Sequence, residues 1–282
     1  MYGILEKEKL APNVVRFKIE APAVARKAQP GQFVILRVDE RGERIPMSLA
    51  GWDRERGTVD ITFLVVGTST RKLSLLNPGE GVLNVAGPFG RPTEVEHYGE
   101  VVCAAGCFGV GAMLPVAAAL KEKGNRIVAV MEGRSKAFLF WEDRLRAVSD
   151  ELVVATGDGS VGRKGWANDV IADLIAAGRR VDRVIALGCT FMMMECSKAT
   201  RPHGVPTVVS LTPIMVDGTG MCGCCRVQVG GQTRFACVDG PEFDGHQVDW
   251  DLLISKQKSY LDEELRSLDL WERANWHKLM AR

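Results

Sequence analysis

The chain has 282 residues, of which 46% are hydrophobic and 25% are charged, and its formal net charge is +1. This balance is typical of a soluble globular protein with room for two domains and a third small one. It gives no reason to expect a nucleic-acid or membrane surface, and neither a membrane-length apolar run nor an apolar signal core is present. We therefore expect a cytoplasmic protein, in which the eight cysteines serve metal or redox chemistry rather than disulfides.

Residues 1–98 have the pattern of a β-domain. Short apolar or alternating stretches are separated by turns rich in glycine and proline, such as Gln29–Gln32 and Asn77–Gly81. Several short strands at this spacing are typical of a barrel or a sandwich. The predicted strands are Asn13–Ile19, Phe33–Val38, Thr58–Val66 and Val82–Ala86.

Two segments of this β-domain combine small residues, hydroxyl groups and cations. One runs from Arg44 through Pro46 and Met47 to Ser48, and the other from Gly67 to Ser74. Open backbone amides, hydroxyl donors and positive charge suit a diphosphate. The alternative interpretation of each segment is an ordinary turn.

Together with Gly87–Gly90, these segments resemble the flavin-binding domain of the ferredoxin–NADP⁺ reductase superfamily. The resemblance implies FAD as a cofactor, with two sets of contacts. Many members place the arginine one position nearer the serine, where this chain has Ile45, so the sequence does not decide whether Arg44 reaches the phosphates. The implied contacts are Arg44, Pro46, Met47 and Ser48 in a strand beside the isoalloxazine, and Gly67, Thr68, Ser69 and Thr70 at the start of a helix under the diphosphate.

Residues 99–212 alternate apolar strands with helices, which predicts a doubly wound parallel sheet covered on both faces. The predicted strands are Val101–Ala105, Ile127–Met131, Glu151–Thr156, Arg183–Leu187 and Thr207–Leu211. The predicted helices are Ala112–Lys123, Ala137–Val148, Ala167–Ala177 and Phe191–Thr200.

Ligands of such sheets bind at the carboxyl ends of the strands. A glycine-rich loop ends the first strand and opens the first helix, and bare backbone there lets a pyrophosphate approach the helix amides. The spacing is closer to the loop of ferredoxin reductases than to the G-x-G-x-x-G motif, and a tight turn without a ligand is the alternative. The candidate residues are Gly106, Gly109, Val110 and Gly111.

Three further strand ends carry candidate nucleotide contacts. Glu132 ends the second strand and suits the ribose diol of NAD, whereas Arg134 suits the 2′-phosphate of NADP, and the sequence does not settle the choice. Asp158 and Gly159 end the third strand, in a loop that resembles one beside the dinucleotide in the reductase family. Cys189 ends the fourth and is a candidate wall of the hydride-transfer site, or an ordinary small side chain.

Four of the eight cysteines lie within sixteen residues, near the C-terminal end of the chain. A plant-type iron–sulfur motif has the spacing C-x₄-C-x₂-C…C, and the frame Asp217-x₄-Cys222-x₂-Cys225-x₁₁-Cys237 fits it with an aspartate in the first place. A carboxylate binds iron through oxygen. The competitor of Asp217 is Cys224, which would break the frame. Zinc, bound by Cys222, Cys225 and Cys237 with Cys224 or His246, is the alternative metal.

A hairpin around Gly230-Gly231 is expected to return Cys237 to the other cysteines. Its predicted strands are Arg226–Val229 and Thr233–Ala236. A three-residue loop would place Cys225 directly opposite Cys237, and a two-residue loop would miss this pairing by one residue.

A flavin barrel, a nucleotide domain and a [2Fe–2S] loop, in this order, resemble the electron-transfer subunits of bacterial dihydroorotate dehydrogenases. The aspartate in the cluster frame is closer still to the small subunits of NADH-dependent reduced ferredoxin:NADP⁺ oxidoreductases, which use three cysteines and one aspartate. The implied domains are 1–98 for FAD, 99–212 for NAD(H) and 213–249 for the [2Fe–2S] cluster. The implied cluster ligands are Asp217, Cys222, Cys225 and Cys237.

The resemblance also implies a function. NAD(H), FAD and the cluster would form an electron relay to or from a larger flavo-iron–sulfur subunit, the partner of a heterodimer that completes electron bifurcation with ferredoxin and NADPH. An electron-transfer role in dihydroorotate oxidation and a zinc-binding protein without redox function are the alternatives.

Residues 250–282 form a charged, amphipathic extension. Leu261, Leu265, Leu268 and Trp271 recur at helical spacing, with Trp276 beyond them. The predicted helix packs either on its own chain or on the partner subunit.

Overall fold

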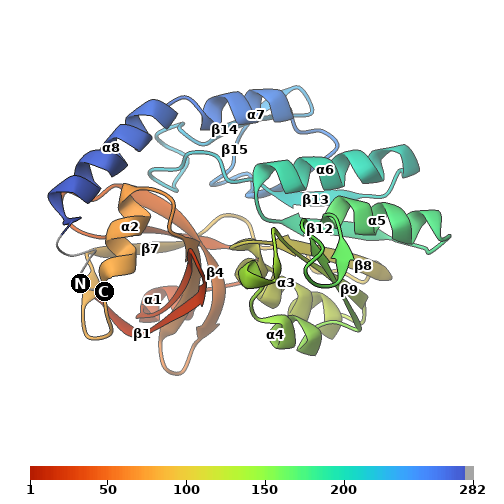
Figure 1. Cartoon of the computed structure of the whole chain (residues 1–282), viewed down its shortest axis with the longest axis horizontal. Helices are drawn as coiled ribbons and strands as arrows, with labels where there is room; N and C mark the ends of the chain where they lie inside the picture. Colours follow the sequence, from red (N-terminus) through yellow and green to blue (C-terminus); the bar gives the residue numbers. More distant parts are fainter. Residues whose placement is uncertain (277–282) are drawn as a thin grey trace.

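The computed structural model of the chain describes residues 1–276, and its first part is an antiparallel barrel (Figure 1). Seven strands form one sheet in the order β6-β1-β2-β5-β4-β3-β7. Phe17, Leu36, Leu49 and Ile61 are fully buried between them. The elements are β1 (Tyr2–Ala11), β2 (Val14–Glu20), α1 (Pro22–Ala25), β3 (Phe33–Arg37), β4 (Arg44–Asp53), β5 (Thr58–Leu64), α2 (Thr68–Leu75), β6 (Gly81–Val82) and β7 (Asn84–Phe89).

Strand β1 is absent from the sequence prediction because its middle is charged rather than alternating. Its charges are paired across the sheet: Glu6 accepts hydrogen bonds from Arg16 and Lys18 of β2, both at 2.9 Å. The single strand predicted over Val82–Ala86 is wrong in detail, since β6 and β7 divide it and pair with different neighbours, β1 and β3.

The second sheet has the strand order β11-β10-β9-β8-β12-β13-β16. All its strands are parallel except β16, which runs antiparallel to β13. The elements up to β13 are β8 (Glu100–Gly106), α3 (Gly109–Glu122), β9 (Arg126–Gly133), η1 (Lys136–Phe138), α4 (Glu142–Ala147), β10 (Glu151–Thr156), β11 (Arg163–Lys164), α5 (Ala167–Ala176), β12 (Arg183–Leu187), α6 (Thr190–Thr200), η2 (Arg201–His203) and β13 (Thr207–Ser210).

Helices cover both faces of this sheet, as predicted. Alternate residues of β8 face opposite sides: Val101 and Cys103 pack with the side chains of α3, whereas Val102 and Ala104 pack with those of α5 and α6. The chain reverses direction across the sheet between β8 and β12, so the crevice outside their carboxyl ends is the expected ligand site. Cys103 is a core residue.

The helix predicted over Ala137–Val148 is wrong. The segment contains a 3₁₀ turn, η1, and a helix of six residues, α4. Trp141 separates them with φ 58°, a left-handed conformation that an α-helix does not contain. The Trp141 ring packs against Phe140, with 5.7 Å between the ring centroids, and under the Arg144 guanidinium. Phe140 is buried and Trp141 packs beside it against the core formed with α3, β8 and β9, so tertiary contacts hold the break in place.

The last part of the chain joins both sheets. A hairpin of β14 (Arg226–Val229) and β15 (Gln232–Phe235) precedes β16 (Glu242–Asp244), which completes the edge of the second sheet. Helix α7 (Trp250–Gln257) follows, and α8 (Leu261–Ala274) crosses back over the barrel to lie above α2 (Figure 1). The predicted extension beyond residue 276 lies outside the described residues. None of the helices in the described part is both long and apolar enough to span a membrane.

Candidate functional site

An apolar cavity of about 210 Å³ separates the barrel from the second domain. The barrel contributes Pro46, Met47 and Ser48 of β4, as predicted for a flavin ring, and also Phe33 and Thr62. The remaining walls come from elsewhere in the chain: Phe108, Leu211, Met215 and Pro241. A flat apolar ring placed here would contact the barrel, the nucleotide domain and the segments on either side of the cysteine cluster.

The cavity continues into a groove of about 760 Å³ that is lined by the predicted diphosphate segment. Helix α2 begins at Thr68, and its first N–H groups have no partner inside the helix. The Thr70 hydroxyl accepts hydrogen bonds from the N–H groups of Val66 and Gly67, both at 3.0 Å, and so fixes this start. Ser69 donates to Glu43, and Arg44 lines the groove as an exposed cation.

The glycine-rich loop packs closely against its neighbours. A Cβ on Gly109 would lie 2.0 Å from the carbonyl oxygen of Leu187, and one on Gly111 would lie 2.3 Å from Oγ1 of Thr62 in the barrel. Packing between β12, the barrel and the start of α3 therefore requires both glycines, whether or not a pyrophosphate binds. Gly106 and Val110 are buried in the same loop.

Glu132 is buried and accepts a hydrogen bond of 2.9 Å from the N–H of Ala167, at the start of α5. Burial raises the pKa of its carboxyl. One oxygen therefore has a structural partner, and contact with a ribose stays a prediction. Arg134 is exposed beside Asp158, whose N–H donates to the Arg134 carbonyl at 3.1 Å, while the Asp158 carboxylate accepts from the N–H of Ser160.

Cys189 lies at the start of α6, is exposed, and stands beside the loop that contains Cys107. Cys107 has φ 52°, so the glycine-rich loop holds a non-glycine residue in a left-handed conformation. Burial raises the pKa of the Cys107 thiol, and the nearby Cys189 adds to the shift. The two thiols therefore lie near each other, and the role of Cys189 as a wall of the hydride-transfer site stays a prediction.

The hairpin brings Cys237 to Cys225. It has a two-residue loop, because Val229 pairs with Gln232, and Cys225 therefore faces Ala236, one residue away from Cys237. The two sulfurs nevertheless lie 3.2 Å apart, and both residues are buried. Burial raises the pKa of the Cys237 thiol to about 12.

Asp217 and Cys222 lie together on the preceding loop, where Asp217 acts on the Cys222 thiol. The N–H of Cys224 lowers the pKa of the Cys222 thiol most, the N–H of Asp217 lowers it further, and the Asp217 carboxylate opposes the shift. A hydrogen bond from the Thr219 hydroxyl lowers the pKa of Asp217. Cys224 is exposed and contacts Cys222.

Glycines fold this loop onto the barrel. Gly218 has φ 83°, and a Cβ there would lie 2.8 Å from the ring of Phe89 in β7. Gly220 has φ 84° and lies against Val238. The loop that carries Asp217 therefore rests on the flavin barrel, close enough for Arg44 to lower the pKa of that carboxyl.

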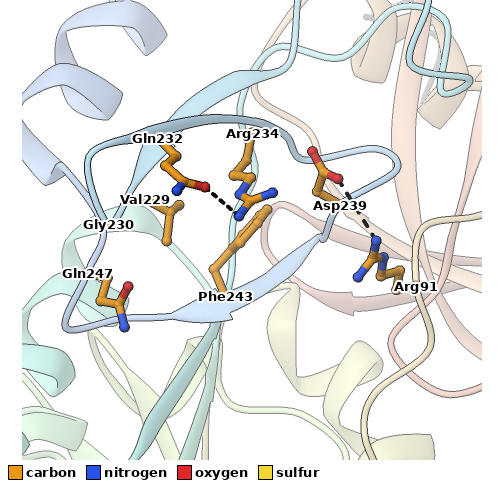
Figure 2. A pocket seen from close by; sticks show the side chains of 8 residues that line it. All are labelled: Arg91, Val229, Gly230, Gln232, Arg234, Asp239, Phe243 and Gln247. Atoms are coloured by element: carbon orange, nitrogen blue, oxygen red, sulfur yellow. Dashed lines mark hydrogen bonds and ion pairs between the residues drawn. The ribbon is translucent and has the colours of Figure 1, made fainter.

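A separate hollow of about 390 Å³ lies behind the hairpin (Figure 2). Arg91 lies in the linker between β7 and β8, residues 90–99, and its guanidinium forms an ion pair of 4.0 Å with Asp239 (Figure 2). Arg234 donates a hydrogen bond to Gln232 within β15. Arg91 also donates to the carbonyl of Val238 at 3.2 Å. Arg91 thereby ties the residues after Cys237 to the barrel side of the molecule.

Sequence reasoning missed the residues that complete the cavity from other elements. Phe108 belongs to a loop in which only the glycines gave a signal, and Met215 precedes the cysteine cluster without any motif. Phe33 was assigned to a strand and to no site. Spacing identifies residues of one segment, whereas these side chains meet only through tertiary packing.

Residues 212–249 match the family model "Iron-sulfur cluster binding domain of dihydroorotate dehydrogenase B". The electron transfer subunit homolog of dihydroorotate dehydrogenase B from Thermotoga maritima is 47% identical over 261 residues, which cover 93% of this chain and 92% of that protein. The chain belongs to the family of dihydroorotate dehydrogenase B electron-transfer subunits. The subunit from Desulforamulus reducens, 34% identical over 86% of this chain and 95% of its own length, is a further member.

Solved structures agree with this family. A chain from the structure of NADH-dependent reduced ferredoxin-NADP oxidoreductase is 43% identical, with a TM-score of 0.90, over 99% of this chain and 98% of that one. A ferredoxin NADP⁺ reductase from Neisseria gonorrhoeae, 15% identical with a TM-score of 0.59 over 72% of this chain and 90% of that one, shares the fold. The predicted fold class, a barrel followed by a doubly wound sheet and a small iron–sulfur-binding region, is thereby confirmed.

Proposed function

We propose that this electron-transfer subunit binds FAD, NAD(H) and a [2Fe–2S] cluster, and passes electrons to or from a larger flavo-iron–sulfur subunit that uses ferredoxin and NADPH. The observation that carries the proposal is the junction of the three parts. The apolar cavity is bounded by β4, by Phe108 beside the nucleotide crevice and by Met215, two residues before Asp217.

The spacing of the cluster residues supports two irons rather than one zinc. Asp217, Cys222, Cys225 and Cys237 stand at the spacing of plant-type cluster ligands, and the sulfurs of Cys225 and Cys237 lie 3.2 Å apart. A zinc site of the finger type takes two closely spaced pairs of ligands, whereas this sequence has one such pair, Cys222 and Cys225.

Residues of this chain would hold the FAD and the iron–sulfur cluster and fix their positions relative to each other. FAD held here would supply the chemistry that links two-electron hydride transfer to single-electron transfer. Pro46, Met47 and Phe108 shield the flavin ring from water, the start of α2 holds the diphosphate, and the two glycines of the cluster loop keep Asp217 and Cys222 beside the barrel.

The bifurcating assignment rests on Asp217 and on the extent of the structural match. The match to the NADH-dependent reduced ferredoxin-NADP oxidoreductase chain covers 99% of this chain and therefore includes α7 and α8. Sequence matches to dihydroorotate dehydrogenase B electron transfer subunits cover 86% of this chain for Desulforamulus reducens and 93% for the homolog from Thermotoga maritima. Electron transfer for dihydroorotate oxidation is the second candidate, which family membership supports.

The test is the absorption spectrum and metal content of the anaerobically purified protein, compared with those of D217C and D217A. We expect flavin bands and two irons per chain. D217C should keep the cluster with a lower reduction potential, because thiolate is a softer and more electron-donating ligand than carboxylate. D217A should lose iron. A colourless protein that contains zinc would contradict the proposal, and the subunit that copurifies distinguishes the two electron-transfer roles.

A further inference from the structure

Helix α8 packs on its own chain, over the start of the predicted flavin-diphosphate helix. Thr68 of α2 and Ser267 of α8 share a hydrogen bond of 2.9 Å, and Arg71 forms an ion pair of 2.8 Å with Glu272. None of the residues from Leu261 to Ala274 is buried by these contacts. The attachment is therefore polar, and it leaves Leu261, Leu265 and Leu270 of α8 exposed, whereas Leu268 and Trp271 are half-buried.

Three leucines of α8 face the groove of about 760 Å³. Leu261, Leu265 and Leu268 line it from one face of α8, at the i, i+4, i+7 spacing of a helical stripe. Arg44, the first turn of α2 and the segment Pro213–Val216 also line the groove. The groove thus lies between residues predicted to bind a diphosphate and a helix for which no ligand is predicted from the sequence.

The groove carries charges of both signs, and Glu43 accepts a hydrogen bond from Ser69 at the start of α2. Arg44 and the free N–H groups of α2 favour phosphate oxygens. Glu43, Glu263 and Glu264 also line the groove. Burial raises the pKa of Glu264, and Glu43 and Glu263 raise it further. Carboxylates repel phosphate but accept hydrogen bonds from hydroxyl and amino groups. A ligand of this groove therefore combines phosphate, hydroxyl or amino donors, and a flat apolar part that rests against leucines.

We propose that α8 forms the binding site for the adenosine half of the flavin dinucleotide. The leucine stripe covers the adenine, and the carboxylates accept from its amino group and from the ribose hydroxyls. The inference rests on the proposed function in that it takes the cofactor to be FAD. It assigns to the C-terminal helix a role in selecting FAD over FMN, which has the same ring and ribityl phosphate but no adenosine.

The matched variants are L265S and L270S in the full-length protein. Leu265 is 57% exposed and Leu270 is 56% exposed, so neither substitution removes a core side chain, but only Leu265 lines the groove. The affinities of flavin-stripped protein for FAD and for FMN are measured separately by the quenching of flavin fluorescence. We expect L265S to weaken FAD about tenfold, the scale of one lost apolar contact, and to leave FMN unchanged. L270S should change neither affinity.

The other outcomes separate the two proposals. An unchanged FAD affinity in L265S overturns the role of α8 and leaves the proposed function standing. Equal weakening of FAD and FMN assigns α8 to general stability and also overturns it. Loss of the larger subunit from L265S at normal FAD affinity assigns the stripe to the subunit interface instead. A wild-type protein that binds neither flavin contradicts the proposed function itself.

Discussion

The glycine-rich loop of the nucleotide domain and the cysteine loop near the C-terminus both contain candidate ligand residues, but these residues have different surroundings in the structure. Gly109 and Gly111 touch neighbouring elements so closely that no side chain fits, and Glu132 is held by the start of α5. In the cysteine loop, Cys222 is exposed and the Asp217 carboxylate contacts only groups of its own loop through hydrogen bonds.

A sequence motif is evidence of ligand binding only where packing does not already account for its residues. In the nucleotide domain, packing already explains the residue types, so the motif by itself says little about a ligand. In the cysteine loop, packing explains the glycines at 218 and 220 but not the thiol at 222 or the carboxylate at 217. Ligand binding is the remaining reason for their spacing.

The largest expected effect is that of C237S, compared with C224S. Cys237 is buried against Cys225, and its replacement removes one ligand of the proposed cluster, so we expect complete loss of iron and of the iron–sulfur absorption. C224S should retain both, because Cys224 lies outside the frame. Iron analysis and visible spectra measure the effect, and circular dichroism controls for folding. If C224S lost iron and D217A retained it, Cys224 rather than Asp217 would be the fourth ligand.

An intermediate effect is expected from E132A and E132Q. E132A leaves the N–H of Ala167 without its acceptor and should lower the free energy of unfolding by about 1–3 kcal/mol. E132Q keeps an oxygen in place and should cost less than 1 kcal/mol, on the order of one neutral hydrogen bond. Denaturant unfolding measures both. A raised KM for NADH in E132Q at normal stability would show that the carboxylate also serves the ribose.

The smallest effect is a pH dependence of stability at Glu242, where β16 meets the linker. Burial raises the pKa of this carboxyl to about 7, against a hydrogen bond from Thr93 and the positive charge of Arg183, which lower it. The folded protein therefore holds a proton that the unfolded chain releases near pH 4.5. Stability from this group is present below pH 4.5 and falls as the pH rises to about 7.

E242Q removes this titration, since the amide stays neutral while its oxygen still accepts from Thr93. The variant should melt at a higher temperature than wild type at pH 8, by a margin that vanishes near pH 4.5. Melting curves at the two pH values measure it. A margin that is the same at both would assign the effect to packing rather than to charge.

Most of the fold could be predicted from the sequence because its signals are local. The parallel strands are continuous apolar runs, and their predicted bounds agree closely with β8, β9, β10, β12 and β13. The failures occurred where tertiary contacts override local pattern. Trp141 breaks a predicted helix because it packs with Phe140 against the core formed with α3, β8 and β9, and β1 contains a charged run whose partners lie in β2 and at the end of α2.

The sequence by itself determined the frame Asp217-x₄-Cys222-x₂-Cys225-x₁₁-Cys237 and the order of the three parts, because both depend on spacing along the chain. Only the tertiary structure decided that Cys225 and Cys237 pair through a two-residue loop, that the loop of Asp217 rests on the barrel, and that α8 covers the groove beside α2. These contacts join residues up to about two hundred positions apart. Periodicity records which face of a helix is apolar, but not which surface that face meets.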